Sequence, residues 1–123
     1  MDCIFCKIIA GEVPTYTVYE DEYVKAVMDI NPNSNGHILV MPKKHVTDFM
    51  DIDNETLGHI HDAAKIIKEI QYRTFSPDGL SLHVNYGIYQ AVKHYHLHLI
   101  PVYKEKRDII TPGQSYNLLM QNK

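Results

Sequence analysis

The sequence contains no tryptophan, only two cysteines and no excess of basic charge among its 123 residues. Its 12 basic and 15 acidic residues give a formal net charge of -3, which argues against a protein that binds nucleic-acid backbones. No apolar run approaches the roughly 20 residues that a membrane span requires. No basic stretch precedes an apolar segment at the N-terminus, so a signal peptide is not expected. These absences favour a cytoplasmic protein.

The length favours one domain over residues 1–123. The two cysteines, Cys3 and Cys6, form a C-x-x-C pair. In a reducing compartment such a pair is more typical of a metal clip or a reactive pair than of a structural disulfide. Histidine, by contrast, is abundant, with eight residues.

Turn residues and apolar periodicity predict an α+β fold, with a mainly antiparallel sheet of about five strands and one long helix packed on it. The helix is expected to be capped by Asp53 or Asn54 and to end at the turn that begins with Ser76. We expect strands over residues 15–19, 23–28, 37–42, 80–85 and 91–103, the long helix over 54–75, a short helix or turn over 3–10, and an irregular or briefly helical tail from 112.

Three histidines alternate with large apolar residues at His94, His96 and His98. In a strand, successive side chains point to opposite faces, so all three imidazoles would share one face. Alternate positions lie about 6.6 Å apart, which suits three tasks on one substrate. Imidazole, with an ordinary pKa of about 6.5, can serve as nucleophile, acid, base or metal ligand.

Metal ligation and catalysis are both open to this run. A His-x-His pair such as His96 and His98 is a good zinc pair, so a zinc enzyme is one interpretation. The outer two histidines are about 13 Å apart at their backbones, so three ligands for one ion are hard to draw from the run alone. A division of labour, in which His96 attacks and its neighbours assist, is the preferred interpretation.

The chain resembles the histidine triad family, whose mark is His-φ-His-φ-His-φ-φ with φ apolar. Residues 94–100 match that pattern fully. The similarity extends over about residues 2–103 and is closest to the small bacterial members and the purine nucleoside phosphoramidases. It rests on further segments in the family's order at residues 3–14, 18–21, 28–32 and 36–45.

The resemblance implies a nucleotide hydrolase or nucleotidyl transferase that acts on the α-phosphate of a purine nucleoside monophosphate derivative, as a phosphoramidase or a dinucleoside polyphosphate hydrolase does. By position, His96 is the nucleophile and carries a covalent nucleotidyl group. His98 contacts the phosphate and assists the leaving group, His94 supports His96 or binds a metal, and His37 positions the nucleophile. The implied substrate-binding residues are Asp29 for the ribose, Ile8, Val27 and Ile30 for the base, and Asn85 and Gln90 for the phosphate.

Two further features follow from the resemblance. Some bacterial members hold a structural zinc ion, whose ligands here would be Cys3, Cys6, His45 and His94. A set of two cysteines and two histidines suits a closed tetrahedral site, although the chemistry itself needs no metal. Members also pair as homodimers with one continuous sheet.

The segment before the triad departs from the family pattern. Tyr89 stands where relatives carry glycine, Ala91 where phosphoramidases often carry serine, and Val102 where many relatives carry arginine. The stretch 85–94 is also shorter than in the family pattern. These changes leave a second function open, a nucleotide-binding regulatory module with little turnover.

Overall fold

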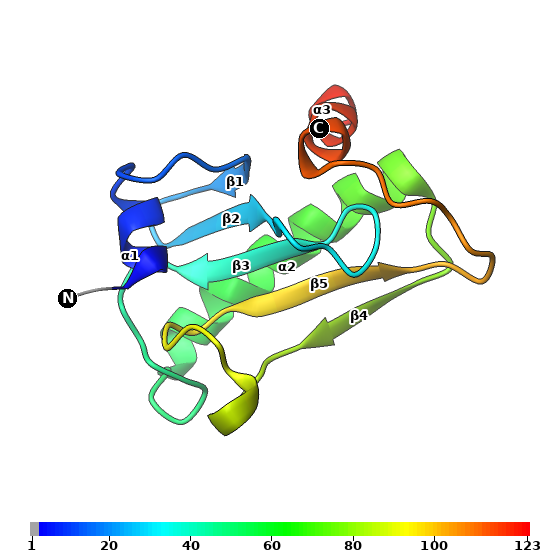
Figure 1. Ribbon diagram of the computed structural model, residues 1–123. Coiled ribbons are helices and arrows are strands. Elements are labelled where there is room, and N and C mark those ends of the chain that lie inside the picture. The colour runs from blue at the N-terminus through cyan, green and yellow to red at the C-terminus, as the bar shows by residue number, and fades with distance from the viewer. Residues whose placement is uncertain (1–2) are drawn as a thin grey trace.

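A five-stranded antiparallel sheet forms the centre of the structure, a computed structural model that describes residues 3–123 (Figure 1). The chain is α+β, as predicted. The elements are α1 Ile4–Ile9, β1 Thr17–Glu20, β2 Val24–Met28, β3 Ile38–Pro42, α2 Asn54–Phe75, β4 Gly79–His83, the 3-10 helix η1 Gly87–Tyr89, β5 Leu97–Val102 and α3 Pro112–Gln121.

The strands lie in the order β1-β2-β3-β5-β4, and every neighbouring pair is antiparallel. The last strand, β5, therefore lies between β3 and β4. Its registers pair Leu39 with His98 on one side and His83 with His98 on the other. Because paired residues share a face, these registers bring distant histidines together.

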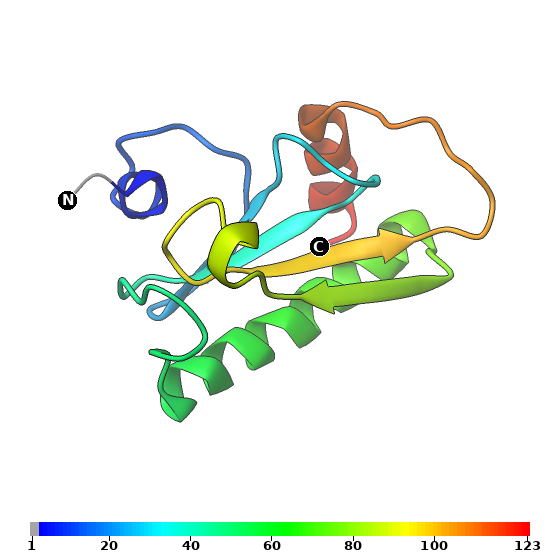
Figure 2. The same ribbon diagram turned by 60° about the horizontal axis from the view of Figure 1, so that its bottom comes forward.

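The two faces of the sheet have different roles. Helix α2 crosses one face, whereas α1 lies on the opposite side (Figure 2). On the α2 face, Leu97 and Leu99 of β5 pack into the main core with the buried stripe of the helix, which includes Ile60 and Ile67. Alternation along β5 then directs His96 and His98 to the face that α1 only partly covers.

The long helix has the bounds that the sequence predicts, and its signals act as expected. Asp53 is the N-cap, and its Oδ1 accepts a hydrogen bond from the Thr56 amide at 2.7 Å. The helix ends at Ser76, which adopts a left-handed conformation with φ 45°. Within the described residues, 3–123, no helix is both long and apolar enough to cross a membrane.

The prediction of a strand over 91–103 is wrong at its beginning. Only Leu97–Val102 is a strand, and residues 91–94 form bends. The cause is a contact with a distant segment, because the Tyr95 amide donates a hydrogen bond to the Val46 carbonyl at 2.6 Å instead of joining the sheet. His94 therefore lies on a loop, and its side chain is fully buried.

The C-terminal segment is more regular than expected. Thr111 and Gln114 form a capping box, and Pro112 occupies the first turn, so Pro112–Gln121 forms a ten-residue helix. Leu119 of this helix is fully buried in the main core. Tyr116 also packs against Tyr16, with ring centroids 5.2 Å apart. Tertiary packing against β1 and α2 thus stabilises a segment whose composition is mostly polar.

Gly36 precedes His37 and lies against Phe75 at the end of α2. A substitution at Gly36 therefore tests the packing between these two segments. The φ of Gly36 is +86°, and a Cβ added there would lie 2.9 Å from the Phe75 ring. We expect Gly36→Ala to lower the free energy of unfolding by more than about 1 kcal/mol, since it adds both strain and a clash. Gly58 of α2 has no atom within 4 Å of such a Cβ, so Gly58→Ala should raise it by about 0.5–1 kcal/mol. Urea unfolding measures both, and effects of the same sign would contradict this account.

Candidate functional site

His96 is held in one tautomer by the loop that precedes β5. Its Nδ1 lies 2.8 Å from the carbonyl oxygen of His94, and its ring packs edge-on against Phe5 with centroids 4.9 Å apart. A carbonyl oxygen can only accept, so Nδ1 carries the hydrogen and Nε2 keeps its lone pair. Burial lowers the pKa of His96, which is only 7% exposed. The residue therefore presents a neutral imidazole with a free Nε2, as a nucleophile requires.

A chain of hydrogen bonds fixes His98 in the opposite tautomer. The Asn33 amide donates to His37 Nδ1 at 3.1 Å, so His37 Nε2 carries a hydrogen. That Nε2 lies 3.0 Å from His98 Nδ1, which must accept. His98 Nε2 then carries its own hydrogen. Among the described residues this buried atom has no hydrogen-bond partner, so it is free to donate to a ligand.

The charge state of His98 follows from its surroundings. Burial, followed by the neighbouring imidazoles of His96, His37 and His83, lowers the pKa of His98 to about 4. Since the ring is neutral near pH 7, its Nε2–H acts as a hydrogen-bond donor and not as a strong acid.

Asp29 lies just after β2 and continues this chain. Its Oδ2 is 3.3 Å from His37 Nε2, and its Oδ1 accepts from the Asn31 amide at 2.8 Å. The ligand atoms of Asp29, His37 and His98 all lie close enough to hold a metal ion. However, His37 Nε2 carries a hydrogen while Nδ1 accepts from Asn33, so the arrangement favours a hydrogen-bond chain over a metal site.

The residues expected to bind substrate are divided between two environments. Ile8 and Val27 are buried together in the apolar cluster beneath α1, near Phe5. Ile30, in contrast, is 74% exposed and lies outside that cluster. Asn85 is half-buried.

Gln90 belongs to a loop that is closed by its own polar groups. Its Nε2 donates to the Thr47 carbonyl at 2.6 Å, and only 5% of the residue is exposed. Lys93 Nζ donates to the carbonyls of Gly87 and Gln90, both at 2.9 Å. The side-chain amide of Gln90 thus fixes the loop to residue 47, which limits its role toward a phosphate in this conformation.

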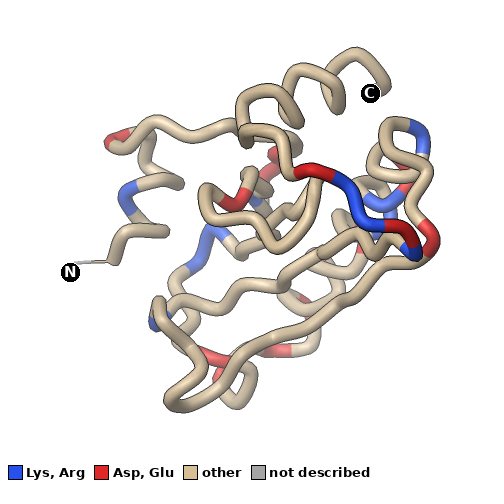
Figure 3. The backbone as a smooth tube through the Cα atoms, turned by 45° about the vertical axis from the view of Figure 1, so that its right-hand side comes forward, with Lys and Arg blue, Asp and Glu red and all other residues tan. Residues whose placement is uncertain are grey.

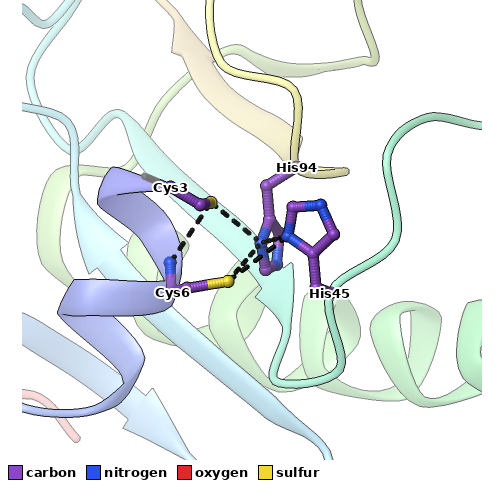
Figure 4. A group of neighbouring side chains, drawn as sticks. All are labelled: Cys3, Cys6, His45 and His94. Atoms are coloured by element: carbon purple, nitrogen blue, oxygen red, sulfur yellow. Dashed lines mark hydrogen bonds between the residues drawn. The ribbon is translucent and has the colours of Figure 1, made fainter. Parts of the chain in front are cut away.

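A second cluster lies beside the first and combines the four residues expected to bind a metal (Figure 4). His94 Nδ1 is 3.5 Å from Cys3 Sγ, 3.6 Å from Cys6 Sγ and 3.2 Å from His45 Nδ1. Cys6 Sγ lies 3.3 Å from His45 Nδ1. These values match a tetrahedral ion with ordinary Zn–S and Zn–N bonds, which separates S and N by about 3.6 Å and two N by about 3.3 Å.

The orientation of His94 also suits a metal ligand. Its Nε2 lies 2.8 Å from the Pro42 carbonyl oxygen, so Nε2 carries the hydrogen and Nδ1 directs its lone pair into the cluster. A backbone carbonyl behind a ligating imidazole is a typical outer-shell partner. His94 therefore acts in two places: its ring belongs to the four-residue cluster, and its carbonyl fixes His96.

His83 is a site residue that the sequence analysis did not identify. It pairs with His98 across the β4–β5 ladder, and the two rings are stacked with centroids 4.7 Å apart. The alternation of side chains in β4 shows which residues share a face with His83. It does not show which strand lies beside β4. The pairing of β4 with β5 was the missing information.

Comparison with known proteins shows the family of the chain. The HIT domain family model matches residues 10–105. An uncharacterized HIT-like protein of Methanocaldococcus jannaschii is 41% identical over 119 residues, covering 94% of this chain and 91% of the relative. The adenylylsulfatase HINT3 of Arabidopsis thaliana is 33% identical over 116 residues, covering 93% of this chain and 58% of the relative.

The fold is also shared with solved structures. A Zn-bound histidine triad family protein from Mycobacterium smegmatis has a TM-score of 0.89 and 32% identity, covering 99% of this chain and 93% of that one. The family model matches most of the chain, the relative and the solved structure match nearly all of it, and this protein belongs to the HIT family.

Proposed function

We propose that this protein hydrolyses nucleotide derivatives at the α-phosphate through a nucleotidyl group carried covalently on His96. The observation that supports the proposal most strongly is the pair of opposite tautomers. His96 offers a lone pair on Nε2, and His98 offers a hydrogen on Nε2, with ring centroids 5.0 Å apart. A phosphoryl group between them would meet a nucleophile and a hydrogen-bond donor at once.

The reaction has two displacements. In the first, the lone pair of His96 Nε2 forms a bond to phosphorus, and the bond from phosphorus to the leaving group breaks. His98 Nε2–H donates a hydrogen bond to a phosphoryl oxygen, which stabilises the charge that develops there. In the second, water attacks phosphorus, the N–P bond breaks, and its electron pair returns to Nε2. One hydrogen of the water stays on the phosphate, and the other is released to solvent, from which the leaving group takes up a proton. The products are a nucleoside monophosphate and the leaving group.

The remaining residues define the nucleoside end of the proposed site. The Asp29 carboxylate would accept hydrogen bonds from the ribose hydroxyls. Ile8 and Val27 would contact the base, with Ile30 at its exposed edge, and we propose a purine. Asn85 would line the phosphate side, and Gln90 would join it after its amide releases the Thr47 carbonyl. The adenylylsulfatase among the relatives supports a nucleotide substrate, whereas the choice between phosphoramidate and dinucleoside polyphosphate depends on the leaving group.

Mass spectrometry tests the nucleophile directly. After mixing with an adenosine phosphoramidate and quenching in mild base, the protein should gain the mass of one adenylyl group. His96→Ala should abolish this adduct and reduce turnover on the order of a thousandfold or more, because the attacking atom is gone. His59→Ala, which removes an imidazole from α2, should leave both unchanged.

The alternatives give different results. An intact protein that binds AMP but forms no adduct and shows no turnover would be the nucleotide-binding module. An enzyme that forms no adduct but loses turnover at once with a chelator would be the zinc hydrolase with His96 and His98 as ligands.

We propose that the cluster of Cys3, Cys6, His45 and His94 holds a structural zinc ion. Two thiolates and two imidazoles are ligands that zinc prefers, and their separations suit a closed tetrahedron. The ion would join α1 to the loop before β5 and so stabilise the carbonyl that fixes His96. Because such thiolates must remain reduced, we also propose the cytoplasm as the location.

Removal of the ion should affect stability. Purified protein should contain about one zinc per chain, and a chelator should lower its unfolding temperature. His45→Gln should lose the metal and unfold at the temperature of the chelated protein, with no further response to chelator. The matched variant His61→Gln, on exposed α2, should retain the metal. Metal-free protein with an unchanged unfolding temperature would contradict the proposal.

We also propose a homodimer with a continuous sheet. Strand β4 is at an edge of the sheet, where its outer backbone groups are available for pairing. Between β4 and α2 lies a depression of about 370 Å³ whose lining includes Ala64, Leu80 and Leu82. Leu82 is 50% exposed, and Ile66 of α2 is 46% exposed. Pairing through β4 would cover this apolar surface.

Light scattering tests the dimer. The parent protein should have the mass of two chains, and Leu82→Lys should reduce it to one, because a lysine would be buried in the apolar interface. Ile88→Lys, at a side chain that is 96% exposed outside this surface, should remain dimeric. A parent protein with the mass of one chain would overturn the proposal.

A further inference from the structure

One face of the sheet carries a row of polar side chains that crosses four strands. It begins at Asp29 after β2, continues through His37 before β3 and His98 on β5, and ends at His83 on β4. Successive members are in contact: Asp29 Oδ2 to His37 Nε2 is 3.3 Å, His37 Nε2 to His98 Nδ1 is 3.0 Å, and the rings of His98 and His83 are stacked. Asp29 and His83 therefore lie on opposite sides of His98.

His83 differs from the other members because its side chain has no hydrogen-bond partner among the described residues. Both nitrogens of His37 and one of His98 take part in hydrogen bonds, whereas neither nitrogen of His83 has a partner among residues 3–123. Its side chain is half-buried, so it has both contact with His98 and access to solvent. A stacked, partly exposed imidazole with free nitrogens is available to a ligand.

The two strands that meet at His83 carry no other charged side chain. Strands β4 and β5, Gly79–His83 and Leu97–Val102, contain no lysine, arginine, aspartate or glutamate. In Figure 3 both strands belong to the tan part of the tube, and the blue and red residues of the segment 104–108 follow after the end of β5. On these two strands, hydrogen bonds to an anion from ionisable side chains can come only from histidine.

We propose that His83 contacts the leaving group and selects nucleotides whose leaving group is anionic, such as a further phosphate. This inference rests on the proposed function, in which Asp29 binds the ribose and His98 the α-phosphate. With the nucleoside on the Asp29 side, the next group along the row reaches His83. An imidazole N–H donates to an anionic oxygen, and such charge-assisted hydrogen bonds are stronger than neutral ones. Sheet pairing through β4 would leave this face open, because it uses backbone groups at the edge.

Binding of AMP and ADP measures the contact without turnover. In a His96→Asn background, ADP should bind about tenfold more tightly than AMP, because its β-phosphate reaches His83. His83→Leu should reduce this preference to about twofold or less while leaving AMP affinity nearly unchanged. His83→Gln, which restores an N–H donor, should recover part of it. His59→Leu is the matched control on α2 and should keep the full preference.

Kinetics with the active protein adds the comparison of leaving groups. His83→Leu should lower kcat/KM for ADP by about tenfold and change that for an adenosine phosphoramidate with an amine leaving group by less than about twofold. Equal losses on both substrates would mean that His83 only supports His98, and the inference would be overturned. An ADP preference that is absent from the parent, or that survives in His83→Leu, would overturn it as well.

The two proposals fail in different ways. If the parent protein turns over neither substrate, the proposed hydrolase function is wrong, while the ratio of ADP to AMP affinity still decides the role of His83. If turnover proceeds through His96 and the ratio does not depend on His83, only the present inference is wrong.

Discussion

The hydrogen bond between His96 Nδ1 and the His94 carbonyl oxygen connects the two parts of the site. The His94 ring takes its position from the Pro42 carbonyl and the two cysteines, and its backbone then sets the tautomer of His96. The bond to the Pro42 carbonyl fixes the His94 ring among the proposed metal ligands. The bond from His96 Nδ1 to the His94 carbonyl leaves the lone pair on His96 Nε2. Packing of the N-terminal helix is thereby linked to the reactivity of a residue more than 90 positions away.

A second constraint acts on His98 from the loop that precedes β3. The Asn33 amide cannot change its role as donor, so the direction of each hydrogen bond from His37 to His98 is determined. Burial keeps these rings neutral near pH 7, because it lowers the pKa of His37 and of His98. His96 and His98 are thus neighbouring neutral imidazoles of opposite tautomer. This pair is better suited to stabilising charge than to acid catalysis.

The sequence was sufficient where local signals and burial agree. The strands of the first hairpin, the bounds of α2 and the grouping of Cys3, Cys6, His45 and His94 follow from apolar runs, turn residues and the family pattern. The sequence was insufficient where contacts between distant segments determine the bounds or the neighbours of an element. The Tyr95 amide leaves the sheet to bond Val46, so the strand begins at Leu97. His83 became visible only through the register of β4 on β5, and α3 through its packing on β1.

The chain of imidazoles behind His98 also ends at a backbone amide, that of Asn33, which keeps its hydrogen while it donates to His37 Nδ1. It is therefore not a proton wire into the protein interior. Any proton that a departing group requires must arrive with the substrate or from solvent. Leaving groups that are stable as anions need no such proton. The site can therefore release them without a proton donor of its own.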